Sequence, residues 1–316
     1  MQDFDFYPEK PDLVEYAPKS SLSLTIFSLV VFIMVFLLFF EDQFLFLVNL
    51  LIVLIIHELG HFVAMKVFKY ENVRMLFIPL MGAFVQGKKS NYSQKQSLIV
   101  LIAGPFPGIL IGNVLFWYAS LSPQNSWLAE PAIIFVLLNI INLLPIDPLD
   151  GGQMFKLLVR KRVNELLLVV FALISSLVLI GMGAYMRWPV VIAFGFFMAF
   201  RVRAMQKKYQ MHKELYGESV DYATTYKLLS NKDFSKIKEV VLEHTPALRK
   251  FIDQVSSEES EPVLASQVNS VLVTPIKRDT SLFFRLVIIG FWLLSFLSPW
   301  ILSSMLGAQM WGADAL

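Results

Sequence analysis

One stretch of this sequence, Phe44 to Val67, constrains the fold more than any other. It is long enough to cross the hydrocarbon core of a bilayer, which takes about 20 apolar residues of helix. Its second half nevertheless carries three polar side chains, on His57, Glu58 and His61. A charged side chain in the middle of a span costs roughly 2.5–3.5 kcal/mol on insertion scales. The stretch therefore predicts a spanning helix whose polar groups are compensated by something that they bind.

The composition extends this prediction to the whole chain. Of its 316 residues, 56% are hydrophobic, against about 45–50% in soluble proteins. The excess lies in long uncharged runs, so the sequence predicts an all-α polytopic membrane protein. It contains no cysteine, which excludes a disulfide framework, a thiolate metal site and a cysteine nucleophile. Any metal ion must be held by histidine and carboxylate side chains.

The apolar runs predict about seven transmembrane helices. Their approximate limits are Ser21–Phe40, Phe44–Phe68, Ser97–Leu121, Trp127–Leu144, Leu166–Met186, Trp188–Phe200 and Leu282–Ser304. Lysine and arginine gather in three of the connecting segments, Lys66–Lys95, Lys156–Arg162 and Arg201–Lys208. Because basic loops stay on the cytoplasmic side, these segments and the N-terminus are expected to be cytoplasmic. Asp150 is then expected at the same membrane depth as the histidine pair.

The domain limits follow from the same pattern. We expect a cytoplasmic tail at 1–20, a transmembrane domain at 21–200, a polar cytoplasmic insert at 201–281, a last helix at 282–304 and a tail at 305–316. Within the insert, the apolar spacing of Lys232–His244 predicts a helix, and the acidic, serine-rich Ser256–Pro262 predicts a linker. His212 and His244 are expected to be solvated surface residues.

The histidine pair carries the chemistry. His57 and His61 are four residues apart and face the same side of a helix, so both imidazoles can reach one metal ion. Glu58, beside the first histidine, can act as general base toward a metal-bound water. A catalytic zinc site takes three protein ligands plus water. Asp147 and Asp150 are both candidates for the third ligand, and Asp150 is favoured because Gly151-Gly152 follow it and leave room for a metal ion and a substrate backbone.

The segment from Lys69 to Gln96 is too polar to span a membrane, and within it Phe77–Lys88 is apolar but broken by proline and glycine. The alternation over Ala83–Gln86 favours a short strand or hairpin there. Such backbone is tolerated at membrane depth only where protein or a water-filled cavity satisfies its hydrogen bonds.

Two motifs together resemble the site-2 protease family of intramembrane zinc metalloproteases. The first is His57-Glu58-Leu59-Gly60-His61, and the second runs from Asn142 through Pro145 to Leu149-Asp150-Gly151. The resemblance covers roughly residues 44–155, the three-helix catalytic core of the family. It implies one Zn²⁺ ion held by both histidines and Asp150, with Glu58 as the catalytic residue.

The resemblance also implies a substrate site. Met81–Gly87 is similar to the membrane-associated β-hairpin of the family, which is thought to pair with an extended substrate, so Gly82 and Phe84 are candidate substrate-binding residues. Asn142 is expected to donate a hydrogen bond to the substrate or to the oxyanion. Ala103-Gly104-Pro105 with Asn113 resembles the family's small-residue motif on the third span.

The function expected on these grounds is zinc-dependent endoproteolysis in or near transmembrane segments, in regulated intramembrane proteolysis or remnant clearance. The expected partners are single-span membrane-protein substrates and the lipid bilayer, with a cytoplasmic partner possible for residues 201–281 and nucleic acid not expected. The expected location is the inner membrane of a bacterial cell. The alternative is a membrane metal carrier or a non-catalytic binding protein on the same scaffold.

Overall fold

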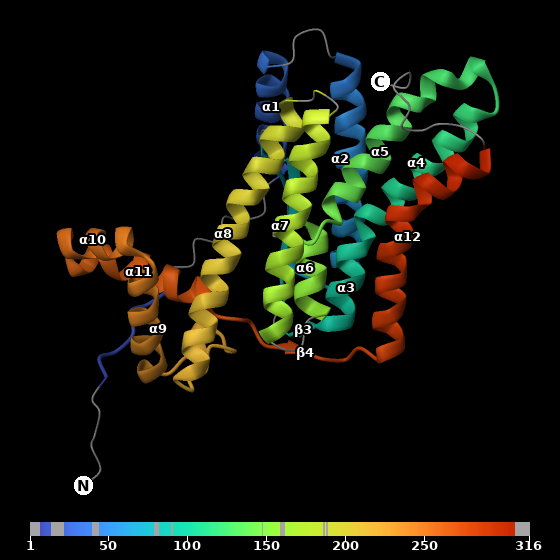
Figure 1. Cartoon of the computed structure of the whole chain (residues 1–316). Coiled ribbons are helices and arrows are strands. Elements are labelled where there is room, and N and C mark those ends of the chain that lie inside the picture. Colours follow the sequence, from blue (N-terminus) through green and yellow to red (C-terminus); the bar gives the residue numbers. More distant parts are fainter. Residues whose placement is uncertain are drawn as a thin grey trace. The chain divides into compact units, whose positions relative to one another are not determined.

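The structure of the chain is a computed structural model (Figure 1). It describes residues 7–13, 22–39, 44–78, 82–89, 91–146, 148–158, 162–185, 187 and 189–306. Contacts divide the chain into two units. The first unit comprises Lys19–Leu158 and Lys277–Leu316, and the second comprises Met1–Pro18 and Val159–Ile276.

The first unit is mostly helical. Its helices are α1 (Leu22–Phe39), α2 (Phe44–Val67), α3 (Gln94–Ala103), α4 (Pro105–Ser120), α5 (Ala129–Asn142), α6 (Asp150–Leu158) and α12 (Leu282–Leu306), with a 3₁₀ turn at Pro123–Leu128. Its strands are β1 (Glu71–Ile78), β2 (Gly82–Lys88) and β3 (Tyr92–Ser93), and β3 pairs with β4 (Ile276–Lys277). The third predicted span is thus split between α3 and α4 at Gly104, where the proline at the first position of α4 suits a helix start.

The predicted hairpin is confirmed. β1 and β2 pair antiparallel, with Met75 opposite Val85 and Phe77 opposite Ala83. Side chains of α1 bond to the outer side of β1: the hydroxyl of Thr25 donates to the Met75 carbonyl (2.7 Å), and the Phe77 amide donates to the hydroxyl of Ser28 (3.1 Å). Because the amide and carbonyl of one strand residue point to the same side, Met75 and Phe77 turn their backbone groups away from β2.

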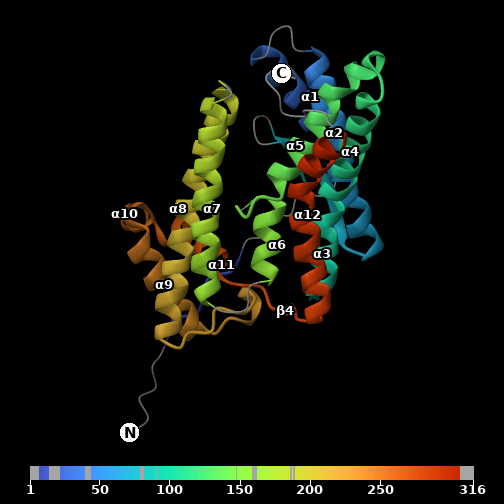
Figure 2. The same ribbon diagram turned by 45° about the vertical axis from the view of Figure 1, so that its right-hand side comes forward.

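Helices α3, α6 and α12 lie side by side (Figure 2). Leu98, Met154 and Ile288, one from each helix, are buried together. The indole N–H of Trp292 on α12 donates to the Leu143 carbonyl just past α5 (2.8 Å). Helix α12, which follows the insert in the sequence, therefore fixes the chain segment that leads to Asp150.

The second unit contains α7 (Arg162–Tyr185), α8 (Pro189–Gly217), α9 (Asn231–His244), α10 (Pro246–Gln254) and α11 (Ser257–Val271), with a 3₁₀ turn, η2, at Tyr226–Leu228. Helices α7 and α8 pack along each other (Figure 1). The insert has an apolar core to which α8, α9 and α11 contribute, for example through Leu215, Ile237 and Val268, each fully buried. The helix predicted over Lys232–His244 is confirmed.

Two expectations for the insert are wrong. Ser256–Pro262 is not a linker, because residues from Ser257 onward form α11, whose Leu264, Ala265 and Val268 pack into the core at helical spacing. His212 is not solvated either. Its side chain is buried, stacks on Tyr222 and donates from Nε2 to a backbone carbonyl (2.8 Å). A polar insert still needs an apolar core, and Leu264, Ala265 and Val268 contribute to it.

Within the described residues, five helical segments are long and apolar enough to cross a membrane. They are Phe44–Val67, Gln94–Ser120, Pro123–Asn142, Leu166–Tyr185 and Leu282–Ser304, and Leu22–Leu38 is apolar but shorter. Many of their large apolar side chains are exposed, as a lipid-facing surface requires. The chain is therefore a helical polytopic membrane protein with a small hairpin, as predicted, and the number of seven spans stays a prediction.

Candidate metal centre

Helix α2 brings the first three polar groups together. His57, Glu58 and His61 are 2%, 4% and 6% exposed, so all three are removed from solvent in the middle of an apolar helix. Charged or hydrogen-bonding groups are buried at a cost unless they are paired. Their partners therefore define the site.

Asp150 reaches the histidines from the first residue of α6. A Cβ atom added to Gly151 would lie 1.9 Å from the Leu143 carbonyl oxygen, so only glycine lets α6 begin so close to the end of α5. The space that Gly151 leaves is thus occupied by the backbone of this chain, and not by the metal ion and substrate backbone that the sequence led us to expect there. Asp150 is itself buried, with 9% of its surface exposed.

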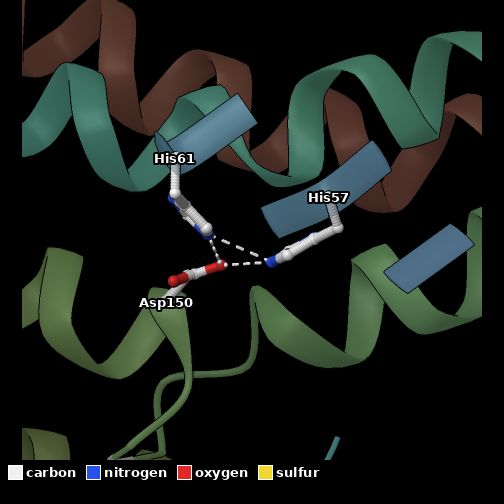
Figure 3. A group of neighbouring side chains, drawn as sticks. All are labelled: His57, His61 and Asp150. Atoms are coloured by element: carbon white, nitrogen blue, oxygen red, sulfur yellow. Dashed lines mark hydrogen bonds and ion pairs between the residues drawn. The ribbon is translucent and has the colours of Figure 1, made fainter. Parts of the chain in front are cut away.

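The three side chains converge on one point (Figure 3). His57 Nε2 and His61 Nε2 lie 3.0 and 3.1 Å from Asp150 Oδ2, and 3.1 Å from each other. Two atoms that bind one tetrahedral zinc ion at roughly 2.0–2.1 Å lie about 3.3 Å apart. The three distances are close to this value, and two imidazoles with one carboxylate form a donor set that zinc prefers. The cluster therefore fits a metal ion with three protein ligands.

Each histidine is held by a hydrogen bond at its other ring nitrogen. His61 Nδ1 donates to the Val100 carbonyl (2.8 Å), and His57 Nδ1 lies 2.7 Å from Asn139 Oδ1. The Asn139 amide group donates to the Phe135 carbonyl (2.6 Å), which fixes its oxygen toward His57. Both rings therefore carry their proton on Nδ1 and direct the lone pair of Nε2 toward Asp150.

Asn139 is a residue that the sequence reasoning missed. Asn139 is fully buried on α5. It lies three residues before Asn142, where the second motif begins, and so it was not among the candidates. An available signal was its position: a second asparagine inside an apolar helix needs a polar partner, and the histidine pair was the obvious candidate.

Two glycines of the third span make space for these side chains. A Cβ atom at Gly104 would lie 2.2 Å from His61 Nε2, and one at Gly108 would lie 2.0 Å from the Asn139 amide nitrogen. The small-residue segment resembling the family motif thus does more than let helices approach. It forms the wall against which one ligand and the support of the other are placed.

The Glu58 carboxylate lies between the histidines and the hairpin. It accepts a hydrogen bond from the Val85 backbone amide on β2. Its Oε2 atom is buried and, within the described part of the chain, has no hydrogen-bond partner. A buried carboxylate oxygen without a partner is costly in a stable fold, which favours a role in which it receives a proton from a bound molecule.

The remaining candidates lie outside the cluster. Asn142 donates to the Leu138 carbonyl (3.1 Å) at the end of α5, and Gly82 and Phe84 are partly buried on β2. Asp147, the alternative ligand, lies outside the described residues. Among those described, His57, His61 and Asp150 form the group that could hold a metal ion.

His57, Glu58 and His61 lie in a segment that is similar to a known family, whereas Asp150 and Asn139 lie beyond that segment. Residues 45–130 match the model of peptidase family M50. Stage IV sporulation protein FB of Bacillus subtilis is 32% identical over 120 residues, which are 37% of this chain and 41% of that protein. A zinc metalloprotease of Methanocaldococcus jannaschii is 26% identical over 121 residues, 37% of this chain and 35% of that protein. The predicted resemblance to the site-2 protease family is thereby confirmed.

A solved structure, the site-2 protease from Methanocaldococcus jannaschii, matches with a TM-score of 0.39 and 20% identity, over 57% of this chain and 86% of that one. The chain spans less than half the length of both curated relatives that it matches. The second unit and α12 lie outside the family segment.

Proposed function

We propose, from the premise that residues 45–130 form part of an M50 peptidase core, that this chain is a zinc-dependent intramembrane endopeptidase. The observation that carries the proposal is the convergence of His57, His61 and Asp150 beside a glutamate with a free carboxylate oxygen. These three residues would hold one zinc ion. When bound, zinc supplies a Lewis acid that polarises a carbonyl and lowers the pKa of water.

Glu58 is the proton carrier in this proposal. Its unpartnered oxygen can accept the proton of the attacking water and pass it to the nitrogen of the leaving amine. The Val85 amide holds the other side of the carboxylate group and so fixes its orientation. His57 and His61 keep their Nδ1 protons bound to Asn139 and Val100, which makes them ligands and excludes them as bases.

The hairpin would hold the substrate in an extended form. The outer side of β1 is already bonded to α1 through Thr25 and Ser28. In the observed register, Ala83 and Val85 turn their backbone groups to the outer side of β2. The Val85 amide on this side already meets Glu58. A substrate strand added to the outer edge of β2 would therefore run past the catalytic glutamate.

This register also divides the roles of the substrate-binding candidates. Gly82 and Phe84 turn their backbone groups to β1, so Phe84 would contribute its side chain and Gly82 its small size. Asn142 would bond the substrate or the oxyanion once its amide leaves the Leu138 carbonyl. The expected substrates are single-span membrane proteins in a bacterial inner membrane, cut from the cytoplasmic side of a seven-span enzyme whose N-terminus is cytoplasmic.

The alternative, a metal carrier, needs ligands along a path to both sides of the membrane. Within the described residues, the metal-ligating group is a single buried cluster. Glu58 is not part of this cluster, so a carrier would give its buried carboxylate no role. These features favour hydrolysis.

The deciding experiment replaces Glu58 by glutamine. The Glu58→Gln chain should retain zinc, measured by elemental analysis, and lose cleavage of a reconstituted membrane substrate by 10²-fold or more, the usual scale for a general base. Glu130→Gln, an exposed glutamate on α5, is the matched control and should cleave normally. Cleavage by Glu58→Gln at the wild-type rate would refute the proposal.

A further inference from the structure

The second unit contains a site unrelated to the metal centre. Residues Tyr7–Leu13, here called the N-terminal strap, lie against the insert without forming a helix or strand. Lys10 bonds to Asn231, 221 positions away in the sequence, and Leu13 packs against buried apolar residues of the insert. The strap is therefore a short extended peptide bound to a folded surface.

The Lys10 side chain occupies a cage formed by one turn of the insert. Its ammonium group donates to the backbone carbonyls of Tyr226 (2.8 Å), Lys227 (3.3 Å) and Leu229 (2.5 Å). It also lies 5.5 Å from the centre of the Tyr226 ring. An ammonium group has three donors around a compact charge. Three carbonyls and an aromatic face therefore match its hydrogen bonds and its charge.

The backbone and flanks of the strap are also recognised. The Lys10 amide donates to the Asn231 side chain (3.2 Å), and the Tyr226 hydroxyl donates to the Pro11 carbonyl (2.7 Å). Burial and the nearby carboxylate of Asp12 raise the pKa of Tyr226 to about 12, so this hydroxyl keeps its proton at neutral pH. Leu13 packs on the apolar core. The surface thus binds three parts of the strap: the Lys10 side chain, the Pro11 carbonyl and the apolar side chain of Leu13.

The strap does not fill the space next to the cage. A cavity of about 630 Å³ is lined by strap residues and by polar side chains of the insert, including Thr224, Asn269 and Thr274. A larger peptide segment could use these groups in addition to the cage. The strap is therefore an incomplete ligand for the surface that it covers.

We propose that the carbonyl cage at Tyr226–Leu229 is a peptide-recognition site for a lysine in an extended segment. In this chain it is filled by Lys10, and an added extended peptide that carries a lysine binds by displacing the strap. Pro8 and Pro11 lie on either side of Glu9-Lys10. These prolines keep the strap extended and lower the conformational entropy lost on binding.

The test uses the full chain with one spin label. Because the chain has no cysteine, Glu9→Cys gives a single labelling site on an exposed strap residue. The label should be restrained in the otherwise unchanged chain and mobile after Lys10→Met. Lys232→Met, an exposed lysine of the same insert, is the control and should leave the label restrained.

The second arm adds a synthetic peptide with the sequence of residues 7–13. The bound strap has an effective concentration on the order of mM, so the peptide should bind the Lys10→Met chain at least tenfold more tightly than the chain that keeps Lys10. Millimolar peptide should release the label in the chain that keeps Lys10, which needs no cage variant. Peptides with methionine or arginine in place of lysine should not.

Equal label mobility with and without Lys10, or equal release by the methionine peptide, would overturn the proposal. Equal release by the arginine peptide would overturn its specificity for an ammonium group. Because the metal centre takes no part in these measurements, their outcome is independent of proteolysis.

Discussion

Replacing Asn139 tests how the metal site is built. Its oxygen accepts the Nδ1 proton of His57 at 2.7 Å, and its side chain is fully buried. Asn139→Ala leaves this buried N–H without a partner and frees the imidazole to rotate. Loss of such a support costs about 10–100-fold in metal affinity, which is about 1.4–2.8 kcal/mol at 1.4 kcal/mol for each factor of ten.

The chain offers a matched control in Asn142→Ala, because Asn142 lies on the same helix and its amide also donates to the carbonyl four residues earlier. Zinc affinity, measured by competition with a chelator in detergent, should fall for Asn139→Ala and stay unchanged for Asn142→Ala. Asn139→Asp keeps an acceptor for the His57 proton and should restore affinity. Wild-type affinity in a folded Asn139→Ala chain, or an equal loss in both alanine variants, would refute the reasoning.

Three further predictions follow from single contacts. Gly104→Ala forces a methyl group toward His61, so zinc affinity should fall about tenfold or more, whereas Gly181→Ala, with open space around it, should bind zinc normally. Trp292→Phe keeps an aromatic side chain but loses the indole N–H that donates to the Leu143 carbonyl, and should lower the free energy of unfolding by about 1–3 kcal/mol in denaturant titration. Although burial acts in the opposite direction, hydrogen bonds from the start of α3 hold the pKa of Asp279 below its ordinary value. The stability that these hydrogen bonds add is present above the ordinary pKa of aspartate, and it is lost as the pH falls through the lowered pKa of Asp279. Asp279→Asn should therefore flatten the acidic part of a plot of Tm against pH. An unchanged slope would contradict this prediction.

The sequence alone identified the five long apolar helices found within the described residues and the two histidines that face one side of α2. Apolar runs report a bilayer directly, because a helix of about 20 apolar residues matches the thickness of the hydrocarbon core. The spacing of His57 and His61 is equally local, since a helix puts residues four apart on one face. The hairpin could also be predicted, because its alternation and its glycine are local signals.

What the tertiary structure decided depends on contacts between distant segments. The meeting of Asp150 with the histidines depends on how closely the start of α6 approaches the backbone of Leu143, just past α5, and on the packing of α6 against α3. The support from Asn139 needs α5 beside α2, and it needs Gly108 of α4 to leave space for the Asn139 amide group. Helix α1 binds one edge of the two-stranded sheet through β1, and β2 forms the other edge, where the Val85 amide meets Glu58. Local periodicity says which residues are buried, and only packing says which buried polar groups meet.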